Sequence, residues 1–127
     1  MPKFPRSMSF RICVYPSDET RFAVVAHCLE LDVIGTGNSV QTALEELLEL
    51  IELQFKACSK HNAQLIFPAQ DSVWQMYTMA VEAKRRVPPE LVEKVVANAN
   101  KSFGHPAPLL DNVMATHDLP AEYLALS

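Results

Sequence analysis

The feature that most constrains the fold is a change in apolar spacing within residues 22–55 of this 127-residue chain. The first part, FAVVAHC, is rich in β-branched and aromatic residues, which is typical of a strand. After a short loop that contains Gly35 and Gly37, apolar residues recur every three or four positions, which is typical of a buried helix face. The stretch therefore predicts strand, turn, strand, loop and long helix, and the rest of the chain must pack around it.

The predicted helix has a clear start and one broad apolar stripe. Ser39 is the expected N-cap, because its hydroxyl can accept a backbone amide hydrogen of the first turn, and Asn38 could do the same if the helix began one residue earlier. Gly35 and Gly37 can adopt backbone angles that are closed to other residues, so GTGN can lead from a strand into a helix at a sharp angle. The stripe consists of Val40, Ala43, Leu44, Leu47, Leu48, Leu50, Ile51, Phe55 and Cys58.

The other side of this helix is acidic. It carries Glu45, Glu46, Glu49 and Glu52, and no Lys or Arg occurs anywhere in residues 22–55. With two further acids in the preceding loop, this window has a formal charge of −6, against −4 for the whole chain. One interpretation is a solvated helix face. The other is a docking surface on which these four glutamates bind a basic partner.

The same stretch resembles the HicB antitoxin family. The N-terminal domain of that family has an aromatic strand, an A-x-C-x-E-L-D/P segment, a Gly-containing step, an Asp, Ser or Thr cap and an A-L-x-x-L-x-x-x-I helix. The preceding SFRICVYPSDE also fits the family's opening strand and turn, so the resemblance covers about residues 8–68, roughly half of the chain. The matching residues are Phe22, Ala26, Cys28, Glu30, Leu31, Gly35, Gly37, Ser39, Ala43, Leu44, Leu47 and Ile51.

This resemblance implies a fold and a function. The implied fold is α+β, a small antiparallel β-β-β-α-β sheet of the partial ribonuclease-H-like type, covered by one long helix and without nuclease activity. HicB antitoxins mask HicA, a small basic toxin with a double-stranded-RNA-binding-like fold that cleaves messenger RNA. We therefore expect a non-catalytic antitoxin or a related protein-binding module. The competing expectation is a solitary oligomeric regulatory or ligand-binding domain without a toxin.

The whole chain is expected to comprise a HicB-like domain over residues 1–70, a helical extension over 71–103 and a tail over 104–127. In the first part, alternating apolar residues from Phe10 to Val14 predict a strand that pairs with the next one across the turn-forming PSDET segment. Leu65, Ile66 and Phe67 predict a short last strand at the sheet edge, or one that pairs with its copy in a second subunit.

The expected extension has one or two helices. VWQMYTMAVEAK has a helical stripe, although a strand is also compatible with it, and the Pro-Pro-Glu-Leu start of the next segment is typical of a first helical turn. Apolar residues then recur from Leu91 to Phe103, which predicts a helix ending at Gly104. Beyond Gly104, several prolines and one short apolar cluster predict a loose tail or a last small helix.

Lys84, Arg85 and Arg86 form the one run of basic residues. If VEAKRRV is the end of a helix, the run complements the helix dipole. If it is a strand, Lys84 and Arg86 share a face, and the order of elements resembles the ribbon-helix-helix appendage with which many HicB antitoxins bind operator DNA. Lys84 and Arg86 would then be DNA-binding residues. We favour a packing role for the following helix, because its apolar stripe is strong and phosphate-binding residues are scarce.

Residues for catalysis or metal binding do not converge in this sequence. Glu30 and Asp32 share a strand end, but no other acid is placed to complete a nuclease metal site. His27 and Cys28 are adjacent in a strand and must point to opposite faces. The three cysteines have no metal-ligand spacing, which predicts free buried thiols. We therefore expect no enzyme activity, no metal and no cofactor.

Composition indicates a folded protein of the cytoplasm. A hydrophobic content of 49% is ample for a core, and no apolar run reaches membrane-spanning length. The leader MPKFPRSM has no apolar stretch behind it, which argues against secretion. A sheet covered by one helix leaves a face and an edge open, so we also expect a homo-oligomer. The net charge of −4 argues against a surface devoted wholly to nucleic acid.

Overall fold

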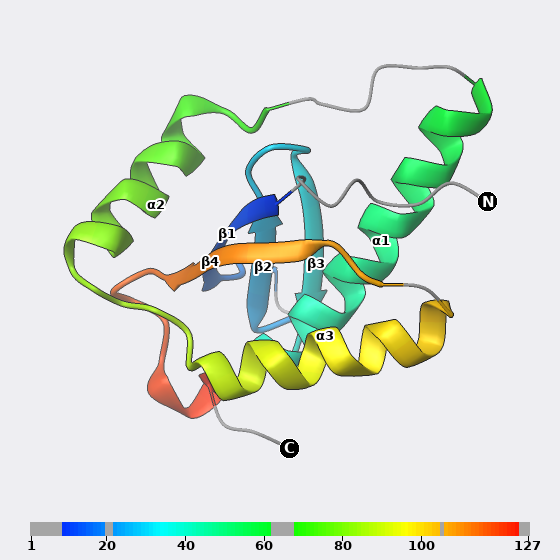
Figure 1. Ribbon diagram of the computed structural model, residues 1–127. Helices are drawn as coiled ribbons and strands as arrows, with labels where there is room; N and C mark the ends of the chain where they lie inside the picture. Colours follow the sequence, from blue (N-terminus) through cyan, green and yellow to red (C-terminus); the bar gives the residue numbers. More distant parts are fainter. Residues whose placement is uncertain (1–8, 20–21, 62–67, 105, 125–127) are drawn as a thin grey trace.

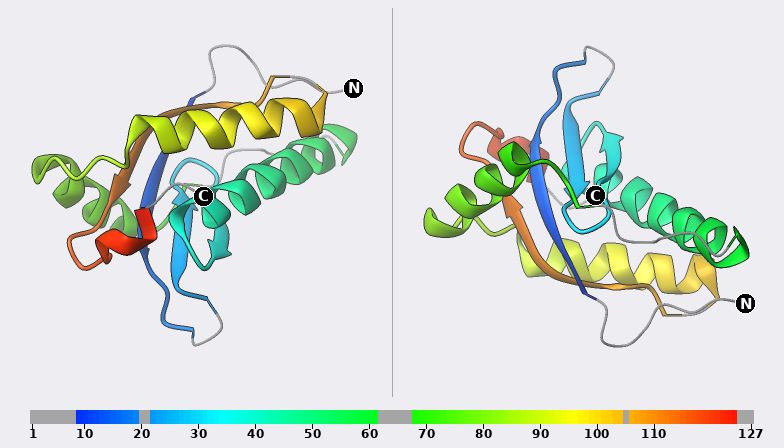
Figure 2. Two further views of the ribbon diagram at one scale, coloured as in Figure 1. Left: turned by 90° about the horizontal axis from the view of Figure 1, so that it is seen from below. Right: turned by 90° about the horizontal axis from the view of Figure 1, so that it is seen from above.

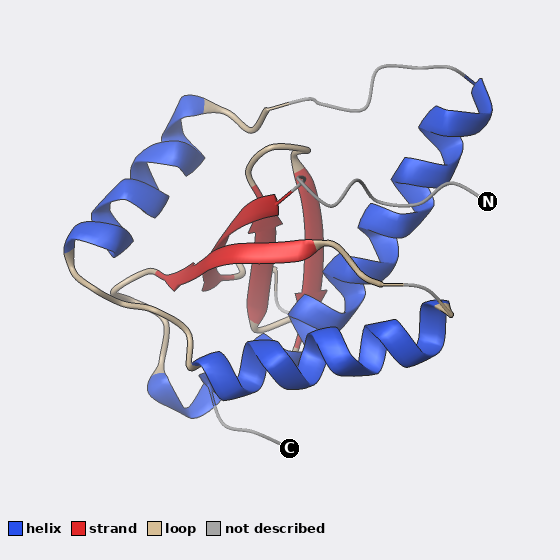
Figure 3. Cartoon of the chain, in the orientation of Figure 1, coloured by secondary structure: helices blue, strands red, loops and turns tan. Residues whose placement is uncertain are grey.

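The computed structural model describes residues 9–19, 22–61, 68–104 and 106–124, and its fold is α+β, as predicted (Figure 1). Four strands form one sheet in the order β3-β2-β1-β4, with the helices packed around it (Figure 3). The elements in chain order are β1 (Ser9–Pro16), β2 (Val24–Cys28), β3 (Val33–Gly37), α1 (Val40–His61), α2 (Asp71–Glu82), α3 (Pro89–Phe103), β4 (Leu109–Ala115) and a short 3-10 helix, η1 (Ala121–Leu124).

The sheet is mixed rather than wholly antiparallel. β1 pairs antiparallel with β2, and β2 pairs antiparallel with β3, as the two predicted turns require. β4 instead runs parallel to β1, with Ile12 opposite Val113 and Val14 opposite Ala115. The antiparallel three-stranded part was therefore predicted correctly, whereas the parallel fourth strand was not.

The fourth strand comes from a segment for which the sequence predicted a loose tail or a small helix, and for residues 109–115 that prediction was wrong. Val113 and Ala115 are buried in the same core as Ile12 of β1. Prolines before the segment suggested a loop, but they end before the paired residues begin. The strand expected at Leu65–Phe67 lies outside the described residues.

α1 begins and packs as predicted. The Thr42 amide donates a hydrogen bond to Ser39 Oγ (3.2 Å), and the Ser39 amide donates to Thr42 Oγ1 (3.1 Å), so Ser39 is the cap. Full burial of one aliphatic side chain contributes about 1.5–3 kcal/mol, so the apolar face of α1 is a major source of stability. Its fully buried members are Val40, Ala43, Leu44, Leu47, Leu48 and Ile51.

The backbones of β3 and α1 approach each other closely at Gly35. A Cβ atom on Gly35 would lie 2.5 Å from the Leu47 amide nitrogen and even closer to the Ala43 carbonyl oxygen. Among the described glycines only Gly104 has a positive φ angle. Gly35 is therefore needed because it leaves room for α1, and not because it adopts the unusual backbone angles that the sequence suggested.

Different helices cover the two faces of the sheet. α1 and α3 lie side by side over one face, where Ile12 and Val14 belong to the larger core (Figure 2). α2 lies against the opposite face, where Cys13 packs with Tyr77 and Ala80 in a smaller apolar cluster. Successive side chains of β1 thus contribute to two cores, one on each face of the sheet.

Among the described residues, none of the helices combines the length and the apolar character needed to span a membrane.

Both predicted C-terminal helices are present. Residues 71–82 form α2, so the alternative of a strand in this segment was wrong. α3 begins with Pro89 in its first turn and ends at Gly104, whose left-handed φ of 72° closes the helix. The buried residues of α3, including Leu91 and Val95, join the core that α1 covers. The favoured packing role of this helix is confirmed.

Residues 83–88 connect α2 to α3 along the outer edge of β4. Lys84 has a left-handed φ of 56°, which ends the helical conformation after α2. The Val87 amide donates to the Val113 carbonyl (2.8 Å), and the Ala115 amide donates to the Arg85 carbonyl (2.8 Å). The basic run is therefore neither a continuous helix nor a full strand, but an extended segment bridged to β4.

Candidate functional site

Two of the four glutamates predicted to bind a partner are used within the fold. Glu46 Oε2 accepts hydrogen bonds from the Thr36 amide (2.6 Å) and from the Thr36 hydroxyl (3.0 Å). Glu52 is only 8% exposed and pairs with Lys56 one turn along the helix (3.5 Å). The acidic side of α1 is therefore not one continuous docking surface.

The other two, Glu45 and Glu49, border a groove between α1 and α3. Glu49 is exposed and Glu45 is half-buried. The groove has a volume of about 110 Å³ and is lined by Glu45, Glu49, Val95, Asn98, Ala99, Ser102 and Phe103, none of them basic. Long basic side chains can lay their aliphatic stems on apolar surface while their charge meets a carboxylate. We call this feature the acidic groove.

The acidic groove depends on the packing of two helices that are far apart in sequence. α1 presents Glu45 and Glu49 on the side next to the buried Leu48, while α3 is held in place by Leu91 and Val95. α3 supplies the groove's apolar floor at Val95, which is 1% exposed. The acidic pattern was visible in the sequence, whereas the contribution of α3 to the site was not.

The two predicted DNA-binding residues border a different cavity. Lys84 and Arg86 are exposed, and both line a cavity of about 310 Å³ with Asn112 and two apolar residues. Arg86 Nη2 donates a hydrogen bond to Asn112 Oδ1 (2.9 Å). The structure thus brings these cations together, but β4 occupies residues 109–115, where the ribbon-helix-helix interpretation requires a second helix.

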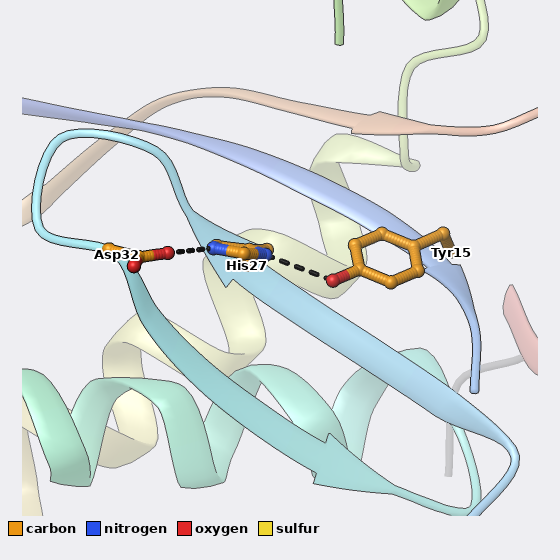
Figure 4. Close-up of polar contacts among 3 residues, drawn as sticks. All are labelled: Tyr15, His27 and Asp32. Atoms are coloured by element: carbon orange, nitrogen blue, oxygen red, sulfur yellow. Dashed lines mark hydrogen bonds and ion pairs between the residues drawn. The ribbon is translucent and has the colours of Figure 1, made fainter. Parts of the chain in front are cut away.

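Sequence reasoning missed a polar network that joins β1, β2 and the following turn. The Tyr15 hydroxyl lies 2.9 Å from His27 Nδ1, and His27 Nε2 lies 2.6 Å from Asp32 Oδ1 (Figure 4). His27 is only 4% exposed, and Asp32 has a positive φ of 52°. The contact between Tyr15 and His27 depends on strand register, for which the local sequence contains no signal.

This network satisfies a buried imidazole rather than activating a nucleophile. Burial, reinforced by the nearby Cys13, Asp32 and Asp18, raises the pKa of Tyr15 to about 12. The hydroxyl therefore remains protonated at neutral pH and can donate to His27 Nδ1, which leaves the Nε2 hydrogen for the Asp32 carboxylate. Both ends of the imidazole are engaged, so the network holds the turn after β2 against the sheet.

The two acids considered for a nuclease site have separate partners. Glu30 Oε1 accepts a hydrogen bond from the Arg11 amide (2.8 Å), and the Arg11 guanidinium lies over the Trp74 ring, 5.6 Å from its centroid. Asp32 binds His27 instead. Within the described ranges, no three His, Cys, Asp or Glu side chains are placed to share a metal ion.

Two of the three cysteines are buried free thiols, as predicted. Burial is the main cause that raises the pKa of Cys13 and of Cys28 to about 12. Both thiols are therefore protonated at neutral pH, and a protonated buried thiol is a poor nucleophile and a poor metal ligand. The side chain of Cys58 lies outside the described part of the chain.

No protein-family model, curated protein or solved structure matches this chain significantly.

Proposed function

We propose that this chain is a cytoplasmic, non-catalytic protein-binding module similar to HicB antitoxins, which neutralises a small basic messenger-RNA interferase of the HicA type. The observation that carries the proposal is the acidic groove, where Glu45 and Glu49 lie above an apolar floor with no basic lining residue. A buried or paired role explains Glu46 and Glu52, but it does not explain these two.

The order of elements supports the same proposal. Three antiparallel strands are followed by a long helix that covers them, and a later strand completes the sheet. This agrees with the β-β-β-α part of the order that the resemblance implies, whereas β4 comes from beyond the stretch that resembles HicB antitoxins. The stretch that resembles HicB antitoxins is thus the part that forms the centre of the fold.

The negative charge of the acidic groove would affect mainly how fast a basic partner associates with this protein. Two carboxylates at a surface groove attract a basic protein during diffusional encounter, and this attraction weakens as salt increases. Charge complementarity of this kind raises the association rate and selects among partners more than it adds to final affinity. We therefore expect apolar contacts on the groove floor to supply much of the binding energy.

We expect the basic partner to be encoded in an adjacent reading frame. A double variant, Glu45→Lys with Glu49→Lys, should weaken its binding by roughly tenfold or more, since surface ion pairs contribute up to about 1 kcal/mol each and charge reversal adds repulsion. The measurement is a titration of purified partner at low and at physiological salt. The loss should be larger at low salt.

The matched control is Glu93→Lys with Glu122→Lys, which makes the same change in net charge at two exposed residues outside the groove. This control should change affinity little. If both pairs weaken binding equally, net charge rather than the acidic groove governs association, and the proposed site is wrong.

Homo-oligomer formation stays a prediction, but the two edges of the sheet are less suitable for pairing with a second copy than the sequence suggested. The Thr36 amide at the outer edge of β3 is already bound by Glu46, and the segment containing Arg86 accompanies the outer edge of β4. Exposed edge amides are what a strand from a second copy would need. We therefore propose that any second copy binds through side-chain surfaces, which include the exposed Met79 and Val81.

Operator binding through Lys84 and Arg86 also stays a prediction. Their shared cavity with Asn112 favours it, because cations and an amide are the groups that contact phosphates and bases. A ribbon-helix-helix mode no longer supports it, because β4 replaces the second helix. Any DNA contact would have to use the edge of β4.

A further inference from the structure

A further cavity lies where the end of α2 meets the chain that follows β4, apart from the acidic groove and from the cavity that Lys84 and Arg86 line. Its volume is about 330 Å³, which falls within the roughly 300–1,000 Å³ typical of small-molecule sites. Ala80 is 3% exposed and belongs to the floor, whereas Met79 is exposed at the rim. The apolar side of the cavity consists of Met76, Met79, Ala80 and Ala83.

Arg85 provides a positive charge in this mainly apolar cavity. Its backbone is held on both sides, because the Arg85 amide donates to the Ala80 carbonyl (3.0 Å) and the Arg85 carbonyl accepts from the Ala115 amide (2.8 Å). Its Nε is buried and has no hydrogen-bond partner among the described residues. A partly buried guanidinium with an unpartnered nitrogen is costly unless an anion compensates its charge.

The other polar groups of the cavity do not supply that anion. Asp118 Oδ1 accepts a hydrogen bond from the Thr116 hydroxyl (2.6 Å), and no ion pair joins Asp118 to Arg85 within the described residues. His117 and Asp118 are exposed at the rim. Arg85 thus lines the cavity without an ion-pair partner among the described residues, and a planar carboxylate can form paired hydrogen bonds with a guanidinium group.

We propose that this cavity binds a small organic carboxylate with a short aliphatic chain. The carboxylate binds the terminal nitrogens of Arg85 and neutralises its charge, while the chain packs on Met76 and Ala80. Asp118 is a like charge at the rim and lowers the affinity for such an anion. The site is separate from the acidic groove and does not depend on the antitoxin function.

The test is a titration of the full chain with 4-methylpentanoate, followed by amide chemical shifts in ¹H–¹⁵N NMR spectra. Saturable shifts are expected at residues 76–85 and 114–118. The neutral alcohol 4-methylpentan-1-ol and the cation 3-methylbutylamine should each bind about tenfold more weakly or not at all, since a hydrogen-bonded ion pair is lost. Shifts that do not saturate, or equal binding of the alcohol, would overturn the proposal.

Variants assign the binding to Arg85. Arg85→Gln should weaken carboxylate binding about tenfold or more, whereas Lys101→Gln, the same charge change at an exposed residue of α3, should leave it unchanged. Asp118→Asn should tighten carboxylate binding severalfold, an effect that a merely structural role of Asp118 would not produce.

If Arg85→Gln fails to fold, Ala83→Glu serves instead, because it adds a negative charge at the exposed rim of the cavity and should abolish carboxylate binding. Unaltered affinity in Arg85→Gln, or in Ala83→Glu, would refute the assignment.

Discussion

A chain truncated after Val87 is expected to aggregate rather than fold, because the deletion removes α3 and β4 together. Four of the large buried side chains that would be lost each contribute about 1.5–3 kcal/mol, or roughly 6–12 kcal/mol in total. A domain of this size is stable by only about 5–15 kcal/mol. The four are Leu91, Val95, Val113 and Leu119, each at most 4% exposed in the whole chain.

The deletion also uncovers surfaces that cannot be solvated favourably. β1 would become an edge strand, since β4 is its parallel neighbour, and Ile12 and Val14 would lose partners in the core. Solubility and far-ultraviolet circular dichroism of the truncated and full chains measure the outcome. A soluble fragment that unfolds cooperatively would show that residues 88–127 form a separable appendage, as the ribbon-helix-helix interpretation requires, and would contradict this account of the core.

Gly35→Ala is expected to destabilise the protein by about 3 kcal/mol, the upper end of the cost of overpacking. The new methyl group would meet the backbone of α1 at Ala43 and Leu47, and backbone atoms cannot rotate away as a side chain can. The helix would have to move off β3, which loosens the contact of Leu47 with the sheet. Urea denaturation of both proteins gives the difference in free energy of unfolding.

Gly104→Ala is the natural comparison for this glycine. A Cβ atom on Gly104 would meet nothing within 4 Å, but its φ of 72° is unfavourable for alanine. That substitution should therefore cost only about 1 kcal/mol. If Gly35→Ala costs no more than Gly104→Ala, α1 is not packed as closely on β3 as described.

Elements with local signals could be predicted from the sequence. α1 has a serine cap and an unbroken apolar stripe, and α3 has a proline start, a stripe and a closing glycine, so each helix is specified by its own residues. β4 has no such signal. It contains Asp111 and Asn112, and its apolar residues are explained only by pairing with β1, which is distant in sequence. Such pairing overrides local preference.

The candidate site was predictable only in part, for a similar reason. The acidic pattern of α1 is visible in the sequence, but the use of Glu46 at β3 depends on where Thr36 lies after folding. The Tyr15 and His27 contact likewise requires the register of β1 and β2. Helical periodicity identifies which residues share a face of a helix. It does not identify which of them form contacts within the folded protein and which remain at the surface.

We propose that Glu45 and Glu49 belong to a surface that neutralises a basic ribonuclease, which we expect to be encoded in an adjacent reading frame. The most direct measurement is the rate at which such a protein cleaves messenger RNA when it is titrated with the full chain. We predict that cleavage falls to zero at a fixed molar ratio, that Glu45→Lys with Glu49→Lys requires a much higher concentration, and that Glu93→Lys with Glu122→Lys behaves as wild type. Cleavage that continues at an undiminished rate with excess chain would contradict the account.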